Sequence, residues 1–199
     1  MLINRYTQQV PKLWNATIET HRAAVRDAIL DAAVALVAER GLRAVTMADI
    51  AARAGIGRAT LYKYFADAEA ILRAWHEREI TGHLAEIAAI AEAPGEPADR
   101  LTAVLERYAA SAHAGRGGHD AELAALLHRD EQVAAARHRL RRLLADLIAE
   151  AAAAGVVRDD IAPDELAAYC LGALAAAGEL SSRAALRRLV TVTLSGLHP

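Results

Sequence analysis

Residues 46–65 read TMADIAARAGIGRATLYKYF, and this stretch decides the fold of the N-terminal part of the chain. Thr46 followed by Asp49 has the spacing of a capping box, which predicts the start of a helix. Gly55 and Gly57 interrupt the helical pattern and predict a tight turn before a second short helix. Two short helices joined by a glycine-containing turn form the outline of a helix-turn-helix unit.

The second short helix has few apolar residues. Leu61 and Phe65 lie four positions apart and predict the face that packs on the preceding helices. The remaining side chains are cationic, small or hydroxyl-bearing and predict an outward face: Arg58, Ala59, Thr60, Tyr62, Lys63 and Tyr64. The major groove of B-DNA admits one α-helix, whose arginines read guanine and whose hydroxyls and amines contact phosphates. The pattern therefore predicts either a DNA-reading surface or a solvated, half-packed face.

The helical pattern continues on both sides of this unit. Apolar residues recur every three or four positions from about Thr20 to Arg40, where Gly41 ends the pattern. Asp67 predicts the N-cap of a long helix that runs to about Ala93. Further helices are predicted over residues 99–113, 121–128, 131–154, 163–177 and 182–197. No strand-like alternation competes with these patterns, so the sequence predicts an all-α fold.

Composition narrows the class of protein. Of the 199 residues 54% are hydrophobic and only 4% are aromatic, and the abundance of alanine favours helices over strands. The single cysteine, Cys170, excludes an intramolecular disulfide and a thiolate metal cage. The N-terminus lacks the pattern of a signal peptide, and no run of eighteen apolar residues predicts a membrane span. We therefore expect a cytoplasmic protein with no membrane partner.

Charge is distributed unevenly along the chain. The net charge is −2, but residues 1–75 hold ten Lys and Arg against seven Asp and Glu. Residues 76–199 hold thirteen against eighteen. Because the local field steers encounter, a basic front can approach a polyanion even when the whole chain is acidic.

Residues 26–75 closely resemble the N-terminal domain of TetR/AcrR-family transcriptional regulators. The matching motifs are ILDAA, the ERG stop, VTMADIAARAGI and TLYKYF, and the match runs for about fifty residues without a gap. The resemblance implies a three-helix DNA-binding domain over residues 20–66, with Arg58 and Ala59 at base-reading positions. The positions that it implies for operator contacts, to bases or phosphates, are Thr46, Arg58, Ala59, Thr60, Tyr62, Lys63 and Tyr64.

Two departures from the family pattern affect expected contacts. Asp67-Ala68 stands where the family often has Ser-Lys, so we expect the lysine–phosphate contact to be absent and Asp67 to act only as a cap. Gly57 stands where serine is common, so a capping hydroxyl is expected to be missing there.

Residues 1–19 precede the resembling region and allow two interpretations. Arg5 and Lys12 could form an arm that enters the minor groove of DNA. The favoured prediction is that this extension packs on its own domain through four apolar or aromatic side chains, Tyr6, Leu13, Trp14 and Ile18.

Residues 67–199 are expected to form a helical domain for dimerisation and effector binding, as the family resemblance implies. Small residues from Gly172 to Gly178 favour close approach of helices, and a two-fold dimer would match a palindromic operator. The stripes predicted to form the dimer interface are Leu166, Cys170, Leu174, Leu186, Leu189, Val190, Thr193 and Leu194. The alternative is that these stripes belong only to the core of one chain.

A small apolar or amphipathic effector is expected in this domain, although the sequence does not specify it. The candidate pocket residues are Trp75, His83, Leu84, Ile87, Tyr108, His113, Leu127 and Tyr169. The spacing of His113, His119 and His128 does not suit a metal site, and neither a metal nor a cofactor is predicted. The sequence thus predicts a ligand-responsive homodimeric repressor, with an activator or an effector-free regulator as the alternative. A helical enzyme or metal-binding protein is the remote alternative.

Overall fold

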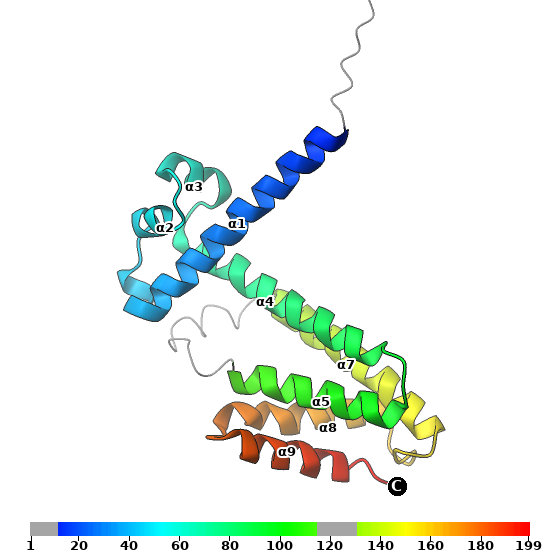
Figure 1. Cartoon of the computed structure of the whole chain (residues 1–199). Coiled ribbons are helices and arrows are strands. Elements are labelled where there is room, and N and C mark those ends of the chain that lie inside the picture. Colours follow the sequence, from blue (N-terminus) through cyan, green and yellow to red (C-terminus); the bar gives the residue numbers. More distant parts are fainter. Residues whose placement is uncertain (1–11, 115–130) are drawn as a thin grey trace, which may run out of the picture. The chain divides into compact units, whose positions relative to one another are not determined.

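A computed structural model of the chain describes residues 12–114 and 131–199 (Figure 1). All regular elements in these ranges are helices, so the predicted all-α fold is confirmed, while the helix predicted over 121–128 lies outside the described residues. The elements are α1 Lys12–Arg40, η1 Leu42–Ala44, α2 Met47–Arg53, α3 Arg58–Tyr64, α4 Ala68–Ala91, α5 Pro97–Ala114, α7 Glu131–Ala153, α8 Pro163–Ala175, η2 Ala176–Glu179 and α9 Arg183–Ser195. In the described ranges no helix is both long and apolar enough to cross a bilayer.

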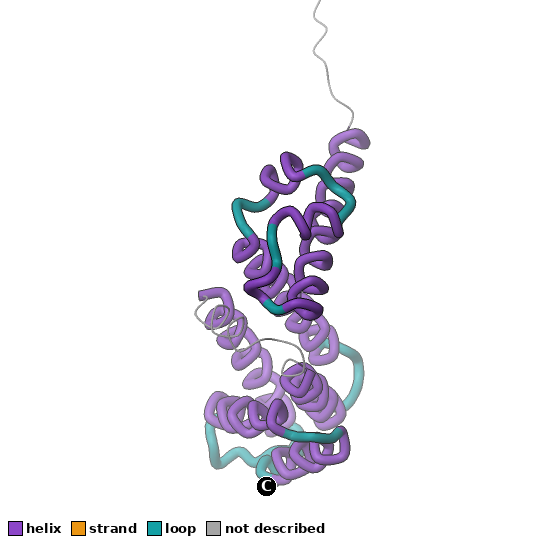
Figure 2. Tube along the Cα trace, turned by 90° about the vertical axis from the view of Figure 1, so that its left-hand side faces the viewer, coloured by secondary structure: helices purple, strands orange, loops and turns teal. Residues whose placement is uncertain are grey.

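The chain folds as two compact units, Met1–Trp75 and His76–Pro199. Figure 2 shows the described residues of both as helices joined by short loops. The sequence placed the boundary before α4, between residues 66 and 67, whereas the units divide inside this helix. The reason is that Ile71 and Leu72, in the first turns of α4, are fully buried within the N-terminal unit.

The core of the N-terminal unit forms where the apolar stripe of α1 packs on α2, and α2 in turn packs on α3. Full burial of such side chains stabilises each by about 1.5–3 kcal/mol relative to exposure. The fully buried large side chains are Ile29, Leu30, Leu36, Ile50, Leu61, Ile71 and Leu72. Gly41 follows α1 with a φ of 78° and a ψ of 158°, a conformation that glycine adopts readily, and the helix ends there as predicted.

The first half of α1 differs from the prediction. The helix begins at Lys12 rather than near Thr20, and residues 17–24 are all exposed. Ile18 is 44% exposed, so the prediction that it packs on its own domain is wrong. The cause is that α1 is longer than the core it covers, which begins at Ile29. Arg5 and Tyr6 lie outside the described residues, as do the side chains of Lys12, Leu13 and Trp14.

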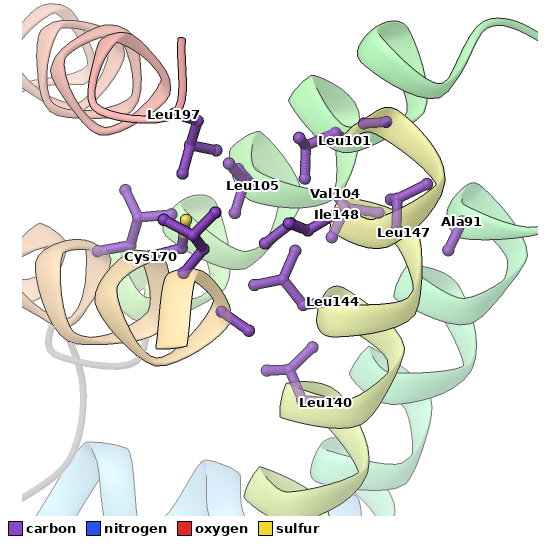
Figure 3. Close-up of a cluster of buried hydrophobic side chains, with 14 of the residues drawn as sticks. Ala91, Leu101, Val104, Leu105, Leu140, Leu144, Leu147, Ile148, Cys170 and Leu197 are labelled. Atoms are coloured by element: carbon purple, nitrogen blue, oxygen red, sulfur yellow. The ribbon is translucent and has the colours of Figure 1, made fainter. Parts of the chain in front are cut away.

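The C-terminal unit is a helical bundle with one large apolar cluster (Figure 3). α7 packs on both α5 and α8, and leucines from the facing sides of these helices fill the space between them. The labelled side chains include Leu101, Val104, Leu105, Leu140, Leu144, Leu147, Ile148, Cys170 and Leu197. Burial raises the pKa of the Cys170 thiol to about 12, so this thiol stays protonated at neutral pH.

Two arginines of α5 bind the second half of α4. Arg100 donates from Nη1 to the carbonyl oxygen of Ala91 at 2.7 Å and from Nη2 to Glu150 of α7. Arg107 donates from Nε to Glu86 of α4 at 2.7 Å. Because these bonds involve a guanidinium, they are stronger than neutral hydrogen bonds, and they connect α4 to α5 and α7 within the C-terminal unit.

Candidate nucleic-acid interface

The N-terminus of α2 is closed by the capping box that the sequence predicted. The Thr46 hydroxyl accepts from the Asp49 backbone N–H at 3.2 Å. In return the Asp49 carboxylate accepts from the Thr46 backbone N–H at 3.1 Å and from its hydroxyl at 2.5 Å. The Thr46 hydroxyl, the Thr46 N–H and the charges of Arg40 and Arg58 hold the pKa of Asp49 below its ordinary value. Asp49 thus occupies the two Thr46 donors that we expected to contact a phosphate.

The turn between α2 and α3 depends on one left-handed glycine. Gly55 has a φ of 68°, which an L side chain rarely adopts, and it lets the Ile56 N–H donate back to the Ala51 carbonyl at 3.0 Å. Gly57 is the N-cap of α3 and provides no side-chain cap, as its lack of a hydroxyl predicted. The backbone N–H groups of the first turn of α3 are therefore not bonded by a capping side chain.

α3 presents most of its side chains to solvent. Leu61 is fully buried and Phe65 is 8% exposed, so these two residues attach the helix to the domain as predicted. Tyr62 is 56% exposed, which is high for an aromatic side chain. Tyr64 is half-buried at the flank. The exposed residues of α3 are Arg58, Ala59, Thr60, Tyr62 and Lys63.

Arginines and lysines of the N-terminal unit differ in whether a carboxylate already pairs with them. Arg53 forms a bidentate pair with Glu39, with N–O distances of 2.8 and 2.7 Å, and this pair holds the pKa of Glu39 below its ordinary value. Nη1 of Arg40 lies 3.7 Å from Oδ1 of Asp49. Arg58 and Lys63 have no carboxylate within salt-bridge distance in the described part of the chain, so their charges remain available to an anion.

The start of α4 follows the expectation for its unusual sequence. Asp67 accepts a hydrogen bond from the Ala70 backbone N–H at 2.7 Å, so its carboxylate caps the helix as predicted. Glu69 in the same turn pairs with Arg73. Ala68 stands where a phosphate-binding lysine is common in the resembled family, and a carboxylate lies on each side of it, Asp67 and Glu69.

Comparison with known sequences and structures decides the family. Residues 29–75 match the family described as bacterial regulatory proteins, tetR family. Residues 96–199, more than half of the chain, match the C-terminal domain described as transcriptional regulator SbtR-like. The crystal structure of a TetR transcriptional regulator from Streptomyces coelicolor is 33% identical, with 87% of this chain and 98% of that chain covered and a TM-score of 0.58. The chain belongs to the TetR family of transcriptional regulators.

Of two further similarities, one covers a shorter stretch of the chain and the other has a lower sequence identity. An uncharacterized helix-turn-helix-type transcriptional regulator of Mycobacterium tuberculosis is 41% identical over 88 residues, which cover 44% of this chain and 43% of that protein. The match thus spans less than half the length of this curated relative. AibR, solved in complex with isovaleryl coenzyme A and operator DNA, is 21% identical with a TM-score of 0.61, over 88% of this chain and 98% of that chain. This likeness shows the fold alone.

The predicted dimer stripe of this TetR-family chain lies largely inside one chain. Five of its residues are buried in the C-terminal unit: Leu166, Cys170, Leu174, Val190 and Thr193. These five side chains therefore pack in the chain's own core, and their contact with a second copy stays a prediction. Leu186, Leu189 and Leu194 are partly buried and pack against the same cluster. On the outer sides of α8 and α9, Tyr169 is 44% exposed and Val192 is 65% exposed.

The predicted effector residues do not converge as one group. Trp75 belongs to the N-terminal unit, Leu127 lies outside the described residues, and Tyr169 is exposed against Gly196 on the outer side of α8. The remaining five lie in the C-terminal unit. Ile87 is buried in the apolar cluster, and Leu84 and Tyr108 pack against it.

Three residues of the predicted effector set in the C-terminal unit carry polar groups: His83, Tyr108 and His113. The His113 ring places Nδ1 3.1 Å from the carbonyl oxygen of Ala177, and His83 is half-buried on α4. Burial raises the pKa of the Tyr108 hydroxyl, and the charge of Arg137 opposes this effect.

A surface hollow of about 350 Å³ in the C-terminal unit lies between α4 and α7 and does not include the predicted effector residues. Its rim is mainly charged, formed by Glu92, Arg139, Arg142, Asp146 and Glu150. Within residues 12–114 and 131–199, no three His, Cys, Asp or Glu side chains converge as metal ligands. His119 and His128 lie outside the described residues.

Proposed function

We propose that the chain is a sequence-specific DNA-binding regulator that works as a ligand-responsive homodimeric repressor. The observation that carries this proposal is the outward face of α3, where Arg58 and Tyr62 are exposed while Leu61 is buried. A helix attached by its inner side alone can enter a major groove without disturbing its own domain. In the proposed complex Arg58 donates to the O6 and N7 atoms of a guanine, and Ala59 contacts a thymine methyl.

The other exposed groups of this face are assigned to phosphates or to less specific contacts. Lys63 and Tyr64 bind phosphate oxygens, and Thr60 and Tyr62 bind bases or backbone. Thr46 reaches a phosphate only if the anion displaces Asp49 from the capping box, because that carboxylate already accepts from its hydroxyl and N–H. Thr46 is therefore proposed as a weaker contact than Lys63.

A two-fold homodimer on a palindromic operator is the assembly we propose. Since the inner stripe of α8 and α9 is buried in the chain's own core, the second copy is placed on their outer sides, where Tyr169 and Val192 are exposed. Two recognition helices then have to meet half-sites about 34–36 Å apart.

The proposed effector is small and apolar or amphipathic, and it binds in the C-terminal unit beside Leu84, Tyr108 and His113. Its binding changes the packing of α5, and the bonds of Arg100 and Arg107 pass this change to α4. Because α4 continues into the DNA-binding unit, a shift of a few Å alters the separation of the two recognition helices and weakens operator binding. AibR, a fold neighbour, was crystallised with operator DNA and an acyl coenzyme A, which supports the compatibility of both ligands with this fold.

A regulator without an effector is the second candidate. It is favoured by the dense apolar cluster around Ile87, Leu105 and Leu144, each no more than 2% exposed. A titration distinguishes the two candidates, because an effector has to change operator affinity by the same factor as the operator changes effector affinity.

Selection of bound fragments from random DNA with the purified full chain tests the proposed function. We expect a palindrome whose half-sites are one helical turn apart, and a complex that contains two chains. Recovery of fragments without a shared sequence would contradict sequence-specific binding, and recovery of single, asymmetric sites would contradict the two-fold dimer.

A further inference from the structure

We call the first half of α1, residues 12–25, the α1 arm; its residues 17–24 are exposed. We propose that the α1 arm is a second DNA contact, in which Arg22 binds a phosphate beside the groove that α3 occupies. The inference rests on the proposed function, because it requires α3 to be seated on DNA. It adds a contact outside the helix-turn-helix and names the phosphodiester backbone as its partner.

Residues 17–24 of the arm take no part in the core of their own unit. Residues 17–24 are all exposed, Val25 is half-buried, and full burial begins only at Ile29. At 1.5 Å per residue, a helix of this length reaches roughly 20 Å. Figure 1 shows this part of α1 continuing beyond α2 and α3. A surface helix that covers no core of its own is free to bind a partner.

The contact between α1 and α3 fixes where the arm leaves the domain. The Arg26 guanidinium lies over the Phe65 ring, 5.5 Å from its centroid, and Phe65 is the C-cap of α3. The arm therefore starts beside the C-terminal end of the recognition helix, where Lys63 lies in the last turn. Arg22 is one turn before Arg26 and is on the same face of α1.

Charge favours a polyanion as the occupant. Residues 1–25 contain Arg5, Lys12 and Arg22 against one acid, Glu19, although the whole chain has a net charge of −2. Glu19 lies 3.7 Å from Arg22, and the two side chains are 74% and 66% exposed. An exposed pair of this kind is weak, so a phosphate can replace the carboxylate.

The dimensions of DNA bring the arm to the backbone rather than to bases. Arg22 lies four residues, or roughly 6 Å along the helix axis, before Arg26, so it stands beside the end of α3, at the edge of a groove about 12 Å wide. The groups at that edge are the phosphates of the flanking strand, which position a protein without reading sequence. Arg22 should therefore contribute to affinity and not to base preference.

The experiment compares the full chain with its Arg22→Ala variant on a duplex selected from random DNA. Removal of one phosphate contact lowers the slope of log K against log salt by about 0.9 per bound chain. At 0.1 M salt this corresponds to roughly a five- to tenfold loss of affinity per chain. The base preference should stay unchanged, and Arg22→Lys should recover most of the affinity. Arg139→Ala, an exposed arginine on α7 away from the proposed dimer surface, is the matched control and should behave like the unmodified chain.

Three outcomes overturn the inference in distinguishable ways. An unchanged salt slope in Arg22→Ala, with a lost base preference in Arg58→Ala, rejects the arm contact and leaves the proposed function standing. A change in the number of associated chains in sedimentation of Arg22→Ala assigns the arm to a contact between copies instead. Failure to select any duplex rejects the proposed function, and the inference with it.

Discussion

α8 buries a larger share of its residues than α3 does. α3 has seven residues, of which only Leu61 is buried, and its C-cap Phe65 completes the attachment. α8 has thirteen residues, and its buried stripe consists of Leu166, Ala167, Cys170 and Leu174. Most side chains of α3 are therefore not needed for the stability of their own unit, whereas the inner side of α8 is buried in the chain's core.

This difference separates two kinds of substitution. Changes on the exposed side of α3 should alter binding with little effect on folding, since exposed substitutions generally change stability by less than about 0.5 kcal/mol. Changes in the cluster around α8 should alter folding whether or not a partner is present. On α8 and α9, the surface that remains for a partner is their outer side, where Val192 is 65% exposed.

The largest expected effect follows truncation inside the bundle. Leu144→Ala removes a fully buried side chain of α7 from the apolar cluster, and it should lower the free energy of unfolding by about 2–5 kcal/mol. Urea unfolding followed by circular dichroism measures this loss. Val156→Ala, just after α7 where the side chain is 39% exposed, is the control and should change stability by less than about 0.5 kcal/mol. Equal losses in the free energy of unfolding from the two substitutions would contradict the distinction between buried and exposed sides.

The next largest effect is expected from substitutions on the exposed face of α3, which should change DNA binding and not folding. Arg58→Ala should weaken binding to the selected duplex by about 1–3 kcal/mol and relax the preference at one base pair of each half-site. Lys63→Ala should weaken all duplexes similarly and reduce the salt dependence, because it removes a phosphate contact. Titration of both variants against matched and mismatched duplexes measures the difference. Similar, sequence-independent losses from both would refute the assignment of Arg58 to a base.

The N-terminal unit could be predicted from sequence in more detail than the C-terminal unit, for a physical reason. The cap at Thr46, the stop at Gly55 and the anchors Leu61 and Phe65 depend on residues close in sequence, so local rules are sufficient for them. The stripe of Leu166, Cys170 and Leu174 was correctly predicted to be apolar. Periodicity shows that a stripe is buried, but it does not show whether the covering surface belongs to the same chain.

Two features of the N-terminal unit could not be predicted locally. The early start of α1 was missed because its first turns have no strong stop or cap signal, and helical bonding continues backward from the packed half of the helix. The pairing of Arg53 with Glu39 joins α2 to the end of α1, and only the fold brings them together. The excess of basic residues before Arg26 was the available signal for the α1 arm.

Thr46→Ala tests whether the cap of α2 matters for folding, and the expected loss is about 1 kcal/mol. Asp49 also loses the hydroxyl that contributes most to its lowered pKa. A carboxyl whose folded pKa lies below 3.8 stabilises the fold above that pH, and this stabilisation is lost as pH falls through the folded value. The difference between Thr46→Ala and the unmodified chain should therefore narrow between pH 7 and pH 3, measured by urea unfolding. Thr46→Ser keeps the hydroxyl and serves as the control.

The smallest effect is expected at the outer seam between α8 and α9, where Gly196→Ala would place a Cβ atom 2.7 Å from the Tyr169 hydroxyl oxygen. Gly196 has a φ of −70°, so alanine itself fits the backbone and gains about 0.4–1 kcal/mol through the unfolded chain. Tyr169 is 44% exposed and can turn toward solvent, so the repulsion should roughly cancel that gain. In a Tyr169→Ala background, the same Gly196→Ala change should instead raise the melting temperature. If Gly196→Ala strongly lowers the melting temperature of the chain that keeps Tyr169, the contact between α8 and α9 is packed as rigidly as the core.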